Sequence, residues 1–100
     1  MKTLSLLLML CSGVALADDL TVSQKDKTFA PGEVTVKAGQ SVTFQNDDTV
    51  AHNVFSKEGK FNLKIQKPGE KKAVSFDEPG TYEVRCAIHP KMILKVKVTK

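Results

Sequence analysis

Four side chains that can bind a soft metal ion stand out in this 100-residue sequence. Cys86, His89 and Met92 lie within the stretch CAIHPKM, and His52 follows a strand-like segment earlier in the chain. A thiolate and a thioether favour copper, whereas imidazole suits copper or zinc. Zinc would accept the cysteine and the histidines but would gain little from Met92. The four residues together therefore favour a copper ion.

This donor set also indicates what the metal would do. Two imidazoles, one thiolate and a weak axial thioether describe a type 1, or blue, copper site for electron transfer. Such a set accommodates both Cu(I) and Cu(II) with little rearrangement, which keeps electron transfer fast. Cys86 ends a predicted strand and Pro90 stiffens the loop after it. Cys86, His89 and Met92 can then turn toward one point.

The first 17 residues have the pattern of a secretory signal peptide. Lys2 precedes an apolar run over residues 4–14, and Ala15-Leu16-Ala17 is a cleavage signal. The run is too short to span a bilayer. We therefore predict a signal peptide over residues 1–17, cleaved after Ala17, and a single domain over 18–100 exported to the periplasm. Cys11 leaves with the signal, so copper would occupy a thiolate at Cys86 that has no disulfide partner.

Short alternating segments dominate the rest of the chain. Apolar residues recur at every second position, and Gly and Pro turns separate the segments. No stretch keeps a helical period for more than one or two turns. We predict an all-β fold, a β-sandwich or barrel of about seven to eight short strands. The clearest strands are residues 20–23, 33–37, 41–45, 72–76, 81–86 and 93–99, and residues 46–68 are expected to be irregular.

Several of these motifs resemble one known family. His52-Asn53 together with Cys86-x-x-His89-x-x-Met92 looks like the cupredoxins, the small blue copper proteins that include plastocyanin and amicyanin. The segments 29–39, 41–46 and 79–82 match as well, and the resemblance covers roughly residues 29–98. The short spacing from Cys86 to Met92 is most similar to that of amicyanin.

The resemblance implies a Greek-key β-sandwich and a role for each site residue. His52, Cys86 and His89 would be the strong ligands of one copper ion, which cycles between Cu(I) and Cu(II), and Met92 would be a long axial ligand. The backbone N–H of Asn53 would bond the sulfur of Cys86. The edge of His89 would be exposed as an electron port, within an apolar patch rimmed by Ala87, Ile88 and Pro90.

Two departures from the family pattern limit the comparison. In plastocyanin an aromatic residue often precedes the cysteine and marks a second electron route, but Arg85 stands there in this chain. The acidic patches of plant plastocyanins are also missing, so their partners do not carry over.

We expect a one-electron carrier between redox partners, such as a c-type cytochrome or a periplasmic oxidoreductase, which would dock transiently near His89. We expect a monomer that is not an enzyme, binds no nucleic acid and has no membrane span. The net charge is only +4, and the basic residues do not form a stripe with interleaved aromatic residues of the kind that binds nucleic acid. Copper binding for tolerance or delivery is the alternative. A nucleophilic Cys86–His89 pair is disfavoured because nothing resembles an oxyanion hole.

The segment 57–72 holds six lysines and two glutamates. It is either a solvated face that protects a sheet edge or a docking surface that steers an acidic partner. Tyr82, at the start of a predicted strand, is expected to tie down a loop and to have no redox role.

Overall fold

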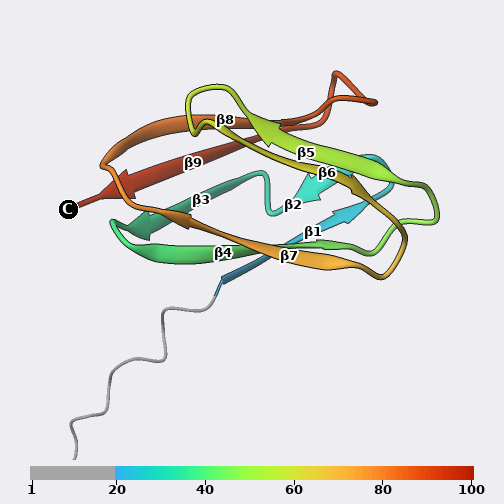
Figure 1. The fold of residues 1–100 in the computed structure, drawn as a ribbon, viewed down its shortest axis with the longest axis horizontal. Coiled ribbons are helices and arrows are strands. Elements are labelled where there is room, and N and C mark those ends of the chain that lie inside the picture. Colours follow the sequence, from blue (N-terminus) through green and yellow to red (C-terminus); the bar gives the residue numbers. More distant parts are fainter. Residues whose placement is uncertain (1–19) are drawn as a thin grey trace, which may run out of the picture.

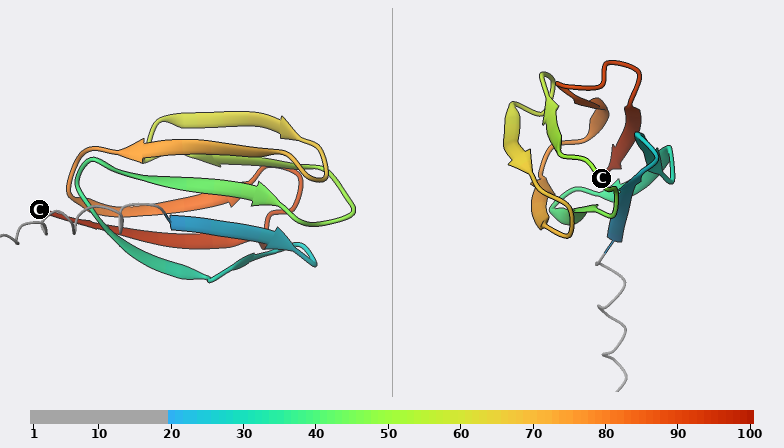
Figure 2. Two further views of the ribbon diagram at one scale, coloured as in Figure 1. Left: turned by 90° about the horizontal axis from the view of Figure 1, so that it is seen from below. Right: turned by 90° about the vertical axis from the view of Figure 1, so that its right-hand side faces the viewer.

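The computed structural model describes residues 20–100, and the predicted signal peptide with Cys11 lies outside this part. Two facing sheets make up the described residues (Figures 1 and 2). Within them, no helix is long and apolar enough to cross a membrane. In chain order, the strands are β1 (Leu20–Lys25), β2 (Thr28–Ala30), β3 (Glu33–Lys37), β4 (Gln40–Asn46), β5 (His52–Ser56), β6 (Phe61–Gln66), β7 (Lys71–Phe76), β8 (Gly80–Cys86) and β9 (Ile93–Thr99).

The chain crosses repeatedly between the two sheets. One sheet has the order β2-β1-β4-β7 and the other has the order β3-β9-β8-β5-β6. β1 pairs in parallel with β4, and β3 pairs in parallel with β9, while the remaining pairs are antiparallel. The predicted all-β sandwich is therefore confirmed.

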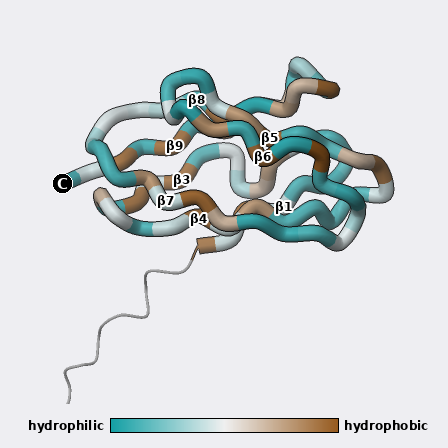
Figure 3. The backbone as a smooth tube through the Cα atoms, viewed as in Figure 1, coloured by the Kyte–Doolittle hydropathy of each residue, from teal (hydrophilic) through white to brown (hydrophobic). Residues whose placement is uncertain are grey.

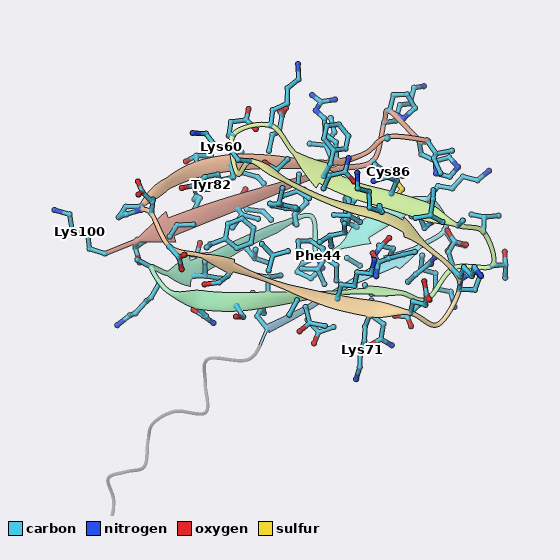
Figure 4. The ribbon with its side chains drawn as sticks, viewed as in Figure 1. Phe44, Lys60, Lys71, Tyr82, Cys86 and Lys100 are labelled. Atoms are coloured by element: carbon cyan, nitrogen blue, oxygen red, sulfur yellow. The ribbon has the colours of Figure 1, made fainter. Side chains whose placement is uncertain are left out.

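Strict alternation explains why most of these segments form strands. In β9, Leu94, Val96 and Val98 are buried between the sheets, and the intervening lysines face the solvent. The alternation of apolar and polar residues is visible along the tube in Figure 3. Phe44 of β4 is fully buried between the sheets (Figure 4), with its ring centroid 6.4 Å from that of Phe29 in an edge-on arrangement. Burial of each such large side chain stabilises the fold by about 1.5–3 kcal/mol.

The expectation that residues 46–68 are irregular was wrong. The structure places β5 and β6 there, and the described chain has nine strands. β5 was missed because its buried positions include the polar residues His52 and Ser56, which hide the apolar alternation. β6 was missed although Phe61, Leu63 and Ile65 alternate with polar residues, because this edge strand lies within the lysine-rich segment. Lys64 within it also has a positive φ of 65°.

The lysine-rich segment 57–72 runs along the open edges of both sheets, because β6 and β7 are each the last strand of their sheet. The Nζ of Lys72 donates to the carbonyl oxygen of Leu63 at 2.7 Å and so links the two edges. Tyr82 ties down the turn before its strand, as expected: its hydroxyl donates to the carbonyl oxygen of Glu78 at 2.6 Å.

The loops that matter for the site lie together at one end of the sandwich. They are the β1–β2 turn, the β4–β5 loop, the β6–β7 loop and the β8–β9 loop, all on the right in Figure 1. The C-terminus lies at the opposite end. Antiparallel pairing of β5 with β8, in which Val54 lies opposite Cys86, brings the start of one strand next to the end of the other.

Candidate metal centre

Three of the predicted ligand residues come together at the loop end of the sandwich. The Nδ1 atoms of His52 and His89 are 3.1 Å apart, and the sulfur of Cys86 lies 3.6 Å and 3.7 Å from them. Atoms at these separations share a centre about 2 Å from each, close to the metal–nitrogen and metal–sulfur bond lengths of about 2.0–2.3 Å found in proteins. The three residues therefore fit one metal ion, and their donor types fit copper.

Each side chain reaches this point from a different element. His52 is the first residue of β5 and is fully buried, whereas Cys86 is the last residue of β8 and is 2% exposed. His89 belongs to the β8–β9 loop and is half-buried. Met92 is buried just before β9, and its backbone N–H donates to the carbonyl oxygen of His89 at 2.9 Å. This bond closes a tight turn from His89 to Met92, which corresponds to the short spacing between these two residues in the sequence motif.

The sulfur of Cys86 also receives a backbone hydrogen bond. The N–H of Asn53 donates to it over 3.3 Å, and the N–H of Ala87 returns a bond to the carbonyl oxygen of Asn53 at 2.9 Å. A donor aimed at the sulfur favours the thiolate, which is the form that binds metal. The two bonds also fix the position of β5 relative to the β8–β9 loop.

Sequence reasoning missed Asp48, which holds the other side of the His52 ring. Its Oδ2 lies 3.0 Å from Nε2 of His52 and accepts the backbone N–H of Lys27 at 2.9 Å. Those two bonds, the one from Lys27 first, hold the pKa of the Asp48 carboxyl well below its usual range. A carboxylate that accepts the Nε2 proton leaves Nδ1 free to bind a metal. The sequence did offer one indication of this role, because Asp48 is an acidic residue four positions before the candidate ligand His52.

Asn46 is a second residue that the sequence did not reveal. It is fully buried, and its side-chain N–H groups donate to the carbonyl oxygens of Val50 and Gln66 at 3.0 Å and 2.9 Å. Its Oδ1 accepts the backbone N–H of Asp48 at 2.9 Å. Asn46 thus shapes the loop that carries Asp48.

A shallow apolar hollow of about 470 Å³ lies beside His89. Ile88, which is 48% exposed, is one of its apolar lining residues. Ala87 is exposed but does not line it. Two cations lie among the lining residues, which are Lys27, Ile88, His89, Pro90, Lys91 and Met92.

Comparison with known proteins agrees with the fold and with copper as the metal. The family described as "Copper binding proteins, plastocyanin/azurin family" matches residues 16–99. Amicyanin from Paracoccus versutus is 33% identical over 87 residues, which cover 82% of this chain and 66% of that protein, so the chain spans just under two thirds of its length.

Solved structures give the same result. The crystal structure of amicyanin from Paracoccus versutus superposes with a TM-score of 0.74 at 30% identity, covering 84% of each chain. A purple cupredoxin from Nitrosopumilus maritimus superposes with a TM-score of 0.73 at 26% identity, covering 80% of this chain and 99% of that one. The chain belongs to the plastocyanin/azurin family of copper-binding proteins.

Proposed function

We propose that this chain is an exported, mononuclear type 1 copper protein that carries one electron at a time between redox partners. His52, Cys86 and His89 are the three strong ligands, and Met92 is the axial ligand. The observation that carries the proposal is the triangle of donor atoms, 3.1 to 3.7 Å apart. When bound, copper supplies the Cu(I)/Cu(II) couple.

The protein contributes by fixing the positions of the ligand side chains. His52 and Cys86 lie on adjacent strands, Asp48 and Asn53 hydrogen-bond one ligand each, and a turn links His89 to Met92. Ligands that are held by hydrogen bonds from neighbouring residues move little when the charge on the metal changes, which favours rapid electron transfer. Burial of His52 and Cys86 also disfavours the alternative of copper delivery, because handing over an ion requires access to its ligands.

His89 is the proposed exit for the electron. Its ring is half-buried and lines the apolar hollow, so a partner that covers this hollow comes close to a ligand. The partner is a redox protein such as a c-type cytochrome or a periplasmic oxidoreductase, met after export directed by residues 1–17. The guanidinium of Arg85 forms a forked pair with Glu83 at 3.0 Å and 2.8 Å, and we assign it no part in transfer.

Optical and EPR spectra of the Cu(II) protein test the proposal. An intense thiolate-to-Cu(II) absorption band is expected, and Cys86→Ser should abolish it. The band positions will also show whether the site is blue or has the distorted geometry of a green, red or purple centre. A colourless Cu(II) complex of the wild-type protein would refute the type 1 site.

A further inference from the structure

Gln24 and Gln66 form a hydrogen-bonded link between the two sheets. Gln24 belongs to β1 of the four-stranded sheet and Gln66 belongs to β6 of the five-stranded sheet, and both are fully buried. Nε2 of Gln24 donates to Oε1 of Gln66 at 3.1 Å. Nε2 of Gln66 donates to the carbonyl oxygens of Phe44 and Glu70 at 3.0 Å and 3.3 Å. A pair of carboxamides thus crosses the interior of the sandwich.

Stability alone does not account for this pair. The NH₂ group of Gln66 faces two carbonyl oxygens, so only its Oε1 is left for Gln24, which must turn its own NH₂ group inward. As a result, Oε1 of Gln24 is buried with no hydrogen-bond partner among the described residues. A buried unpaired acceptor costs free energy, whereas two apolar side chains of similar shape would avoid that cost.

The link adjoins the metal centre through Gln66. Gln66 pairs with His52 across β5 and β6. Its backbone oxygen accepts a bond from Asn46, which in turn accepts the N–H of Asp48. Within residues 20–100, β6 has no strand on its outer side, so its position depends on the bonds that it makes inward. Gln66 therefore acts on the strand beside His52 and on the loop that carries its hydrogen-bond partner.

We propose that Gln66, held by Gln24, is a positioning residue for His52. The pair fixes β6 and the β4–β5 loop against the four-stranded sheet, and Nδ1 of His52 thereby stays near the other two donor atoms before a metal enters. The part of this inference that concerns copper rests on the proposed function. The part that concerns the position of His52 is a property of the metal-free protein.

The test compares Gln66→Leu with the double variant Gln24→Leu/Gln66→Leu. The double variant also removes Oε1 of Gln24, the buried acceptor that has no hydrogen-bond partner in the described part of the chain. Ser56→Ala is the matched control: Ser56 is a buried polar residue at the far end of β5, and its hydroxyl oxygen accepts the N–H of Gly59. Three quantities are measured: the urea midpoint of the metal-free protein, the Kd for Cu(II) by competition with a chelator, and hydrogen exchange of the Asn53 N–H without metal. This N–H bonds the sulfur of Cys86 and so reports on the contact between the two ligand strands.

We expect Gln66→Leu to raise the Kd for Cu(II) about 10-fold or more, the range typical of groups that orient metal ligands, and to speed exchange of the Asn53 N–H. The double variant should recover the wild-type urea midpoint but keep the raised Kd and the fast exchange. Ser56→Ala should lower the midpoint and leave the Kd unchanged. A double variant with the wild-type Kd and wild-type exchange would overturn the proposal, because Gln66 would then be only a packing residue. If the wild-type protein shows no charge-transfer band, the proposed function fails, and exchange of the Asn53 N–H still decides the positioning role.

Discussion

Asp48 and the fully buried His52 form a partly buried hydrogen-bonded pair, with 3.0 Å between Oδ2 and Nε2, on the side of the imidazole away from the metal centre. Oδ2 also accepts the N–H of Lys27, which fixes the carboxylate to the β1–β2 turn. One residue therefore sets both the tautomer and the tilt of the His52 ring. It does so from a loop that is itself held by Asn46.

Asp48→Ala should raise the Kd for Cu(II) by about 10- to 100-fold, because removing a group that orients a metal-binding histidine has effects of that size. Asp48→Asn should raise it less, since an amide oxygen can still accept the proton on Nε2. The measurement is a competition titration of the wild-type and variant proteins. Asp47→Ala is the control, because the neighbouring carboxylate binds Ser23 and Gln45 and does not touch His52. Equal Kd values for Asp47→Ala and Asp48→Ala would contradict the assignment.

Met92→Leu tests the axial position. Leucine has a similar volume and no thioether, so the three proposed strong ligands should still hold copper while the reduction potential changes. Cyclic voltammetry gives the potential, and the charge-transfer band shows whether the site survives. Leu94→Met, a change of similar size at a fully buried position two residues further along the chain, should leave the potential unaltered. Complete loss of copper binding in Met92→Leu would mean that Met92 is more than an axial ligand.

The sequence predicted most of the fold because most strands bury every second residue. In β9 the alternation is unbroken, and the boundaries predicted for it are those observed. β5 and β6 escaped prediction for two different reasons. His52 and Ser56 are polar residues at buried positions of β5. In β6, Phe61 and Leu63 are only half-buried and Ile65 is 50% exposed, so its alternation does not separate a buried face from an exposed one as clearly as in β9.

The candidate site was visible in the sequence where its donors are rare residue types. Cys86, His89 and Met92 are recognisable because thiolate, imidazole and thioether side chains seldom cluster by chance. The residues that hold them were not visible in the same way. Asp48 and Gln66 are common residue types, and only the folded chain shows that one bonds His52 and that the other lies opposite it. Their roles depend on contacts between distant segments, which spacing cannot reveal.

The cations beside His89 should set the rate of reaction with an anionic electron acceptor. Lys27 and Lys91 line the hollow, so they attract negative charge to the proposed electron port. Oxidation of the Cu(I) protein by ferricyanide should therefore slow as ionic strength rises, and Lys91→Glu should slow it at low salt. Lys37→Glu is the control, because Lys37 pairs with Thr99 at the opposite end of the sandwich. A rate that is independent of salt, or equally reduced by both substitutions, would place the port elsewhere.

Ser23 should make the stability of the metal-free protein depend on pH through Asp47. The Ser23 hydroxyl donates to Oδ2 of Asp47 at 2.6 Å, and this bond, followed by the one from Gln45, lowers the pKa of the Asp47 carboxyl. Because the folded-state pKa lies below the unfolded value, the stabilisation is complete above about pH 4 and is lost as pH falls further. The effect is modest, since both groups are near the solvent.

Urea unfolding of the metal-free protein between about pH 2 and pH 6 measures this dependence around the ordinary Asp pKa. Ser23→Ala should lower the urea midpoint above pH 4 and flatten its fall in acid, because the folded-state pKa moves back toward the unfolded value. Asp47→Asn removes the titrating group, so adding Ser23→Ala to it should not change the slope with pH any further. If Ser23→Ala flattens the slope equally in the Asp47→Asn background, the coupling runs through another carboxyl and the assignment to Asp47 is wrong.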